Sequence, residues 1–141
     1  MAAAAEPRPL RVMVYSDDRS VRRAVITALG TRPALDLPEL ELVEVATGPV
    51  VLRTADQGGL DLMILDGEAV PEGGLGLTRQ LKDEVYRCPP ILVLTGRPQD
   101  AWLATWSRAD AVVGHPIDPG QLADTGAALL RRRLPATTRT A

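Results

Sequence analysis

A small set of polar residues in this chain of 141 residues has side chains that could bind a cation, accept a group or donate a hydrogen bond. The set is Asp17, Asp18, Asp66, Thr95 and His115. Carboxylates that crowd together repel one another, and a bound cation relieves this repulsion. A carboxylate at the carboxyl end of a central parallel strand also lies where open α/β sheets build their sites. Shared chemistry therefore requires elements that bring these residues together.

Asp66 follows the most informative stretch of the sequence. Residues 62–65 are four apolar residues in a row, Leu-Met-Ile-Leu. A short apolar run of this kind is typical of a strand that is buried on both faces in a parallel sheet. Taken alone, Asp66 has two interpretations, a functional carboxylate or a turn residue that marks the end of the strand.

The elements that must position these residues alternate along the chain. Strands are predicted at 10–15, 40–46, 62–66, 91–94 and 111–113, and helices at 19–29, 49–57, 75–86, 98–107 and 118–134. Gly30 is a predicted C-cap, Pro49 and Pro119 occupy tolerated first helical positions, and Asp118 is a predicted N-cap. This alternation predicts an α/β fold with a single doubly wound, five-stranded parallel sheet and helices on both faces.

The carboxyl ends of parallel strands lie at one edge of a sheet, so the polar residues should converge on one patch. Each of them also has an alternative structural role. Asp17 or Asp18 can cap the following helix. Thr95 can be a turn residue, and His115 can be a solvated loop residue. The position of all of them at strand ends favours a shared site.

Composition excludes several classes of protein. Hydrophobic residues make up 45% and aromatic residues only 3%, with no Phe, so the core must consist of Leu, Val, Ile and Ala. A net charge of −2 and a pI near 5.4 give no support for nucleic-acid binding. Cys88 is the only cysteine and cannot form an internal disulfide, which fits a reducing compartment. Neither a transmembrane run nor a secretory signal is present, so we expect a cytoplasmic protein without membrane contact.

The length of the chain fits one domain, predicted over residues 10–134. The Ala- and Pro-rich residues 1–9 are predicted to be a flexible N-terminal tail, and residues 135–141 a disordered C-terminal tail. We expect no output domain after the last helix. Arginines 131–133 complement the dipole of that helix and do not indicate a nucleic-acid contact.

The order of these residues resembles the response-regulator receiver domain, the flavodoxin-like (βα)5 module of two-component signalling. That family has an acid pair after the first strand, a phosphoacceptor Asp after the third, Thr or Ser after the fourth and Lys-Pro after the fifth. This chain has Asp17-Asp18, Asp66, Thr95 and His115-Pro116 in those places. The resemblance covers nearly the whole chain and implies a signalling module that is not an enzyme.

The resemblance implies that Asp66 accepts a phosphoryl group with the help of Mg²⁺. Asp17, Asp18 and Asp66 would bind the cation through their side chains, and Glu68 through its backbone carbonyl. A carboxylate is a weak nucleophile toward phosphorus, and a divalent cation neutralises and aligns the incoming group. Thr95 would donate its hydroxyl to a phosphoryl oxygen.

Three positions depart from the family pattern. His115 replaces the usual Lys, and an imidazole is shorter and mostly neutral at pH 7. Val112 replaces the usual Tyr or Phe, which normally moves inward when the Thr moves. Pro71 lies one place later than the usual loop proline. The sequence therefore predicts an atypical receiver with an intact acid end and an altered read-out end.

Two functions stay open. The first is a stand-alone atypical receiver that takes a phosphoryl group on Asp66, from a sensor histidine kinase or phosphotransfer protein, and acts through protein partners. The second is a phosphorylation-independent pseudo-receiver that serves as a protein–protein interaction module. His115 and Val112 favour the second.

The partner surface implied by the family is the face of the fourth helix, fifth strand and fifth helix, which could also support a homodimer. Trp102 and Trp106 lie one turn apart on the predicted fourth helix and share a face. Exposed tryptophans are favoured anchors for a partner. Alternatively, both pack into the core or against the fifth helix, and we expect at least one to do so.

Overall fold

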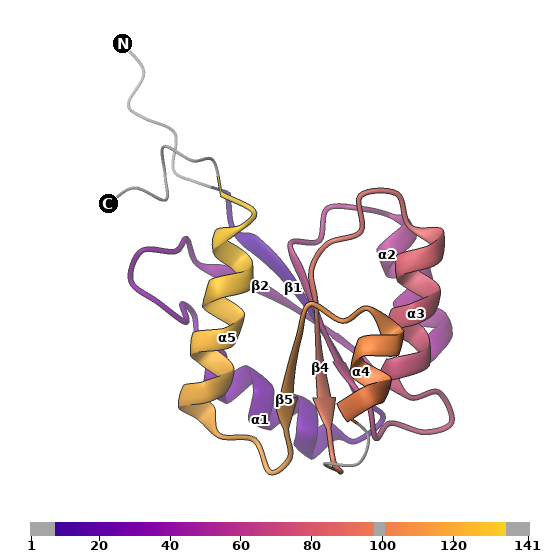
Figure 1. Ribbon diagram of the computed structural model, residues 1–141. Helices are drawn as coiled ribbons and strands as arrows, with labels where there is room; N and C mark the ends of the chain where they lie inside the picture. Colours follow the sequence, from indigo (N-terminus) through magenta and orange to yellow (C-terminus); the bar gives the residue numbers. More distant parts are fainter. Residues whose placement is uncertain (1–7, 98–100, 135–141) are drawn as a thin grey trace.

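Five parallel strands form the centre of the computed structural model, which describes residues 8–97 and 101–134 (Figure 1). The strands are β1 (Leu10–Tyr15), β2 (Leu40–Val45), β3 (Leu62–Asp66), β4 (Ile91–Thr95) and β5 (Ala111–Gly114). Their order across the sheet is β2-β1-β3-β4-β5. Asp66 therefore ends the central strand, between the ends of β1 and β4.

Helices cover both faces of this sheet, which confirms the predicted α/β architecture (Figure 1). They are α1 (Arg19–Leu29), α2 (Gly48–Asp56), α3 (Gly74–Glu84), α4 (Ala101–Ser107) and α5 (Pro119–Arg131). Helices α1 and α5 pack on one face of the sheet, and α2 and α3 pack on the other. Helix α4 lies beside α3.

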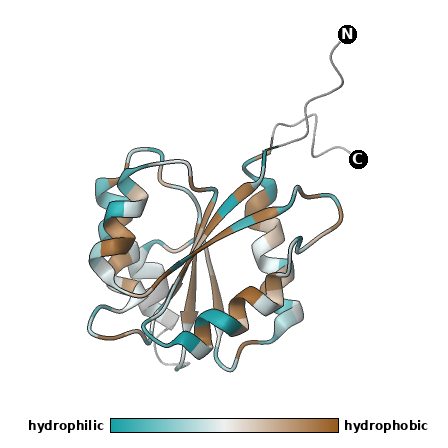
Figure 2. Cartoon of the chain, turned by 180° about the vertical axis from the view of Figure 1, so that it is seen from behind, coloured by the Kyte–Doolittle hydropathy of each residue, from teal (hydrophilic) through white to brown (hydrophobic). Residues whose placement is uncertain are grey.

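Strand β3 is buried on both faces, as its apolar run predicts. Leu62 and Ile64 belong to the core beneath α1 and α5, whereas Met63 and Leu65 belong to the core beneath α2 and α3. Each of the four side chains is 0% exposed. Burying a side chain of this size contributes about 1.5–3 kcal/mol. Figure 2 shows the resulting concentration of apolar residues in the central strands.

The predicted caps are present at the helix ends. Asp18 caps α1 by accepting a hydrogen bond from the N–H of Ser20 at 2.8 Å, and Asp118 caps α5 in the same way. Gly30 ends α1 with a φ of 59°, in the region that favours glycine. Helix α3 ends at Glu84, two residues earlier than predicted, because Val85 has extended backbone.

The remaining boundaries differ slightly from the predicted ones. Helix α5 ends at Arg131, and the N–H groups of residues 132–134 donate to carbonyls three residues earlier, as in a tighter turn. The predicted fourth helix includes residues 98–100, which lie outside the described residues, as do residues 1–7 and 135–141 of the predicted tails.

The folded part of the chain includes Arg8, which the sequence assigns to the N-terminal tail. Its Nη1 and Nη2 donate to the two carboxylate oxygens of Asp61 at 2.9 and 2.8 Å. Asp61 is 1% exposed and also accepts the N–H of Arg11 at 2.9 Å. Arg133 lies 3.7 Å from the same carboxylate. Asp61 thus ties both ends of the described chain to the segment before β3.

The expectation that at least one tryptophan packs into the core or against α5 is wrong. Trp102 is 67% exposed and Trp106 is 46% exposed. Both share one face of α4, and the fold leaves much of that face open to solvent. Trp106 is partly covered by the guanidinium of Arg79 on α3, 4.8 Å from its ring centre.

In the described part of the chain, no helix combines the length and apolar composition that a membrane crossing requires.

Candidate functional site

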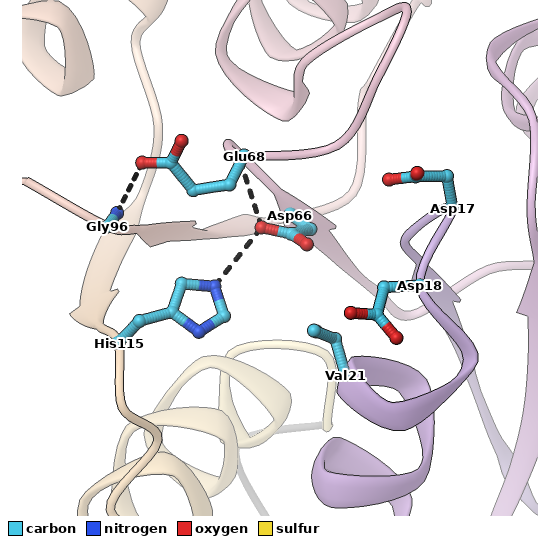
Figure 3. A pocket seen from close by; sticks show the side chains of 7 residues that line it. All are labelled: Asp17, Asp18, Val21, Asp66, Glu68, Gly96 and His115. Carbon is cyan, nitrogen blue, oxygen red and sulfur yellow. Dashed lines mark hydrogen bonds and ion pairs between the residues drawn. The ribbon is translucent and has the colours of Figure 1, made fainter.

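A pocket of about 330 Å³ opens at the carboxyl ends of the strands (Figure 3). It is lined by Asp17, Asp18, Val21, Asp66, Glu68, Gly96 and His115. The fold therefore brings together the acid pair, the acid of the central strand and the histidine, although they are separated along the chain. This juxtaposition follows from the parallel sheet, in which all these strand ends lie at one edge.

Asp66 is 3% exposed, and protein groups hold both of its carboxylate oxygens. Oδ1 accepts the N–H of Glu68 at 2.9 Å and lies 3.1 Å from Nε2 of His115. Oδ2 accepts the hydroxyl of Ser16 at 2.8 Å. These contacts come from the ends of three different strands, so the orientation of this carboxylate is set by the tertiary fold.

Ser16 is a site residue that the sequence analysis missed. Its side chain is 0% exposed, and its oxygen both donates to Asp66 and accepts the N–H of Asp18 at 3.0 Å. A hydroxyl directly before the acid pair, at the end of β1, was the available signal. Ser16 connects the start of α1 to the acid of the central strand.

The two acids of the pair have different roles in the structure. Asp18 caps α1, and the hydroxyl and N–H of Ser20 hold the pKa of its carboxyl below the ordinary value. Asp17 accepts the N–H of Val70 at 3.0 Å, which joins the end of β1 to the loop after β3. One acid therefore serves the helix, while the other contacts the loop that follows Asp66.

His115 reaches the site, a contact that the sequence left open. Its N–H donates to the carbonyl of Thr95 at 2.8 Å, which positions the residue, and its ring extends to Asp66. A carboxylate oxygen only accepts, so this contact requires a hydrogen on Nε2 of the imidazole. Thr95 itself ends β4 but is not among the described residues that line the pocket. Val112 is 39% exposed.

Glu68 contributes its side chain as well as its backbone. The family resemblance implied a role for its backbone carbonyl only. In the structure its carboxylate accepts the N–H of Gly96 at 2.9 Å, across the mouth of the pocket (Figure 3).

The oxygen donors of the pocket suit a hard cation. Among residues 8–97 and 101–134, no three His, Cys, Asp or Glu side chains are grouped to hold a metal ion. Mg²⁺, however, is usually bound through one or two carboxylates and keeps several waters. Asp17 and Asp66 line the same pocket and meet that smaller requirement.

Comparison with family models gives no match. Two response regulatory proteins, from two strains of Mycobacterium tuberculosis, are each 62% identical to this chain over 122 residues. The match covers 86% of this chain and 92% of each relative.

Solved structures show the same fold at lower sequence identity. The receiver domain of the Francisella response regulator 1452 has a TM-score of 0.75 at 16% identity, over 89% of this chain and 99% of that one. The chemotaxis response regulator CheY4 of Vibrio cholerae has a TM-score of 0.72 at 22% identity, over 86% of this chain and 99% of that one. Taken with the closer relatives and the strand-end acids, this places the chain in the response-regulator family, as a receiver domain of two-component signalling.

Proposed function

We propose that this receiver accepts a phosphoryl group on Asp66 and signals through protein partners. The observation that carries the proposal is the position of Asp66, at the end of the central strand and facing a pocket that also holds Asp17 and His115. A carboxylate oxygen of Asp66 would form a bond to the phosphorus of the donor. The bond from phosphorus to the leaving oxygen would break, and the leaving group would keep that electron pair.

The residues around Asp66 have separate tasks in this proposal. Ser16 and the N–H of Glu68 orient the acceptor carboxylate. His115 would donate from Nε2 to a phosphoryl oxygen in place of the usual Lys, and Thr95 would donate its hydroxyl once the β4 loop moves inward.

Mg²⁺ fits the oxygen donors of this pocket. Asp17 and Asp66 would hold it through their carboxylates, and Glu68 through its backbone carbonyl. Asp18 already caps α1, so only its second oxygen is available. When bound, the cation neutralises charge on the phosphoryl group.

Acetyl phosphate with Mg²⁺ should add one phosphoryl mass to the wild-type protein and none to Asp66→Ala. The replacement removes the only oxygen nucleophile assigned to the reaction. Intact-protein mass spectrometry measures the adduct, and Asp56→Ala, an exposed acid at the end of α2, is the control that should keep it. An unmodified wild-type protein, or an adduct that persists in Asp66→Ala, would contradict the proposal.

A second candidate is the phosphorylation-independent interaction module. It is favoured by the state of Asp66, whose oxygens are already satisfied by Ser16, Glu68 and His115. If this candidate is right, Asp66→Ala should bind a partner as the wild type does. If Asp66 accepts a phosphoryl group, acetyl phosphate should change partner binding by the wild type and have no effect on partner binding by Asp66→Ala.

Partners of the proposed receiver would act at two surfaces. A sensor histidine kinase or phosphotransfer protein would approach the pocket. A downstream partner, or a second copy of the chain, would use the face that carries the exposed Trp102 and Trp106 of α4. We expect these interactions in the cytoplasm and without nucleic acid.

Replacing Trp102 with alanine should change the free energy of unfolding by no more than about 0.5 kcal/mol. The side chain is 67% exposed, so its truncation creates no cavity. Chemical denaturation measures the effect, with Leu81→Ala in the buried core as the contrast, expected to cost about 2–5 kcal/mol. A loss of stability near that of Leu81→Ala would show that Trp102 is part of the core in solution.

A further inference from the structure

Glu68 connects Asp66 to the loop after β4 through two separate contacts. Its N–H donates to Oδ1 of Asp66 at 2.9 Å, and its own carboxylate accepts the N–H of Gly96 at 2.9 Å (Figure 3). Gly96 directly follows Thr95 at the end of β4 and begins the segment that leads to α4. One residue thus spans the mouth of the pocket from β3 to β4.

The contact with Gly96 depends on the absence of a side chain there. A Cβ at Gly96 would lie 2.7 Å from Cδ and 2.9 Å from Cγ of Glu68, and closer still to Oε1. The glutamate therefore packs directly on the glycine backbone. This fit holds the carboxylate over a backbone N–H that would otherwise face the pocket.

The charges of the pocket make this contact sensitive to a phosphoryl group. Carboxylates of Asp17, Asp18, Asp66 and Glu68 line it, and among the described lining residues only His115 has a basic side chain. A phosphoryl group adds between about one and two negative charges and strong acceptor oxygens. Such a group on Asp66 would repel the carboxylate of Glu68 and compete with it for the N–H of Gly96.

We propose that the carboxylate of Glu68 is a charged latch, which opposes phosphorylation of Asp66 by occupying the N–H of Gly96. The proposal rests on the proposed phosphoryl acceptance by Asp66. In the closed state Glu68 covers the N–H of Gly96. In the open state the phosphoryl oxygens take that N–H and the carboxylate turns to solvent. Glu68 is exposed, so leaving the pocket costs it little desolvation.

The charge of the latch is tested by Glu68→Gln, which keeps the shape and an acceptor for Gly96 but removes the repulsion. With acetyl phosphate and Mg²⁺, its initial rate of adduct formation should exceed the wild-type rate about three- to tenfold at low salt. The excess should shrink at high salt, because exposed charges are screened. A purely structural role would not produce this salt dependence.

Glu72→Gln is the matched control. Glu72 belongs to the same loop, but its carboxylate packs on Gly48 at the start of α2 and does not line the pocket. Its rate should stay within about twofold of the wild-type rate, since its carboxylate packs on Gly48 and not on Gly96. An equal acceleration in both variants would overturn a specific role for Glu68.

The contact itself is tested without any phosphoryl donor, by hydrogen exchange of the Gly96 amide. The amide should be protected in the wild type and exchange faster in Glu68→Ala, with Glu72→Gln unchanged. Equal exchange in wild type and Glu68→Ala would overturn the latch. Faster exchange combined with an unchanged or lower rate in Glu68→Gln would overturn its opposition to phosphorylation.

The two proposals can fail separately. A wild-type adduct that forms as fast as the Glu68→Gln adduct would overturn the latch and leave the proposed function standing. The absence of an adduct in every variant would overturn the proposed function and, with it, the latch. The exchange of the Gly96 amide would still report whether Glu68 contacts it.

Discussion

Replacing Gly74 with alanine should destabilise the protein by about 2–3 kcal/mol, the cost of overpacking against atoms that cannot yield. Gly74 is the first residue of α3 and sits directly on the backbone of β3. A Cβ there would lie 2.8 Å from the carbonyl carbon and oxygen of Leu65 and 2.9 Å from the carbonyl carbon of Asp66. Either α3 moves away from the sheet, or the end of β3 shifts.

The same substitution should therefore disturb the site. A shift of the Asp66 backbone changes its distances to Ser16 and His115, which now hold its carboxylate at 2.8 and 3.1 Å. We expect a lower denaturation midpoint together with slower adduct formation from acetyl phosphate. Urea unfolding and mass spectrometry measure the two effects on the same sample.

Gly76→Ala is the control for the effect of alanine on α3 itself. Gly76 lies two residues further along the helix, and a Cβ there has no atom within 4 Å. Alanine is the better helix former by up to about 1 kcal/mol, so this variant should be as stable as the wild type or more stable. Equal stability of Gly74→Ala and Gly76→Ala would show that the close contact of α3 with β3 is relaxed in solution.

Replacing Asp61 with asparagine should cost about 2 kcal/mol at pH 7. The carboxylate is buried before β3 and accepts two bonds from Arg8 and one from the N–H of Arg11. Removing one partner of a wholly buried pair costs about 3–5 kcal/mol, and the smaller value applies because Arg8 is largely exposed.

The same variant should lose part of its pH dependence. Burial alone would raise the pKa of Asp61, but hydrogen bonds from Arg8 and Arg11, with the charges of Arg8 and Arg133, outweigh it and lower the pKa. The unfolded chain therefore takes up a proton first as the pH falls. The contribution of Asp61 to stability is fully present above the unfolded pKa of about 4. It is lost as the pH falls below that value and through the folded pKa.

Urea unfolding between pH 7 and pH 3 measures this effect. The stability of the wild type should fall more steeply below about pH 4 than that of Asp61→Asn, so the difference between them should shrink. Asp56→Asn, an exposed acid on α2, should follow the wild-type curve. Parallel curves for wild type and Asp61→Asn would mean that Asp61 is not preferentially ionised in the folded state.

The two ends of strand β3 carry acids with different roles. Asp61 lies just before the strand and ties the ends of the described chain together, whereas Asp66 ends the strand and faces the pocket. The two acids are at opposite ends of the same buried apolar run. Substitutions at Asp61 should therefore change stability with little effect on the chemistry of Asp66.

The sequence by itself determined the architecture and the edge of the sheet where the site lies. The apolar run at 62–65 can be accommodated only where both faces of a strand are covered, and the alternation of strands and helices demands parallel pairing. Local signals such as Asp118 before Pro119 located the helix ends, because a cap acts on the next few residues only.

Only the tertiary structure decided how the residues of that edge share their tasks. Whether Asp17 contacts the loop after β3, and whether His115 reaches Asp66, depends on angles between elements that are distant in sequence. The contact of Glu68 with Gly96 joins two loops across the pocket, and nothing local in either loop predicts it. The exposure of Trp102 and Trp106 likewise follows from the packing of α4 beside α3, since a shared helix face can point inward or outward with the same spacing.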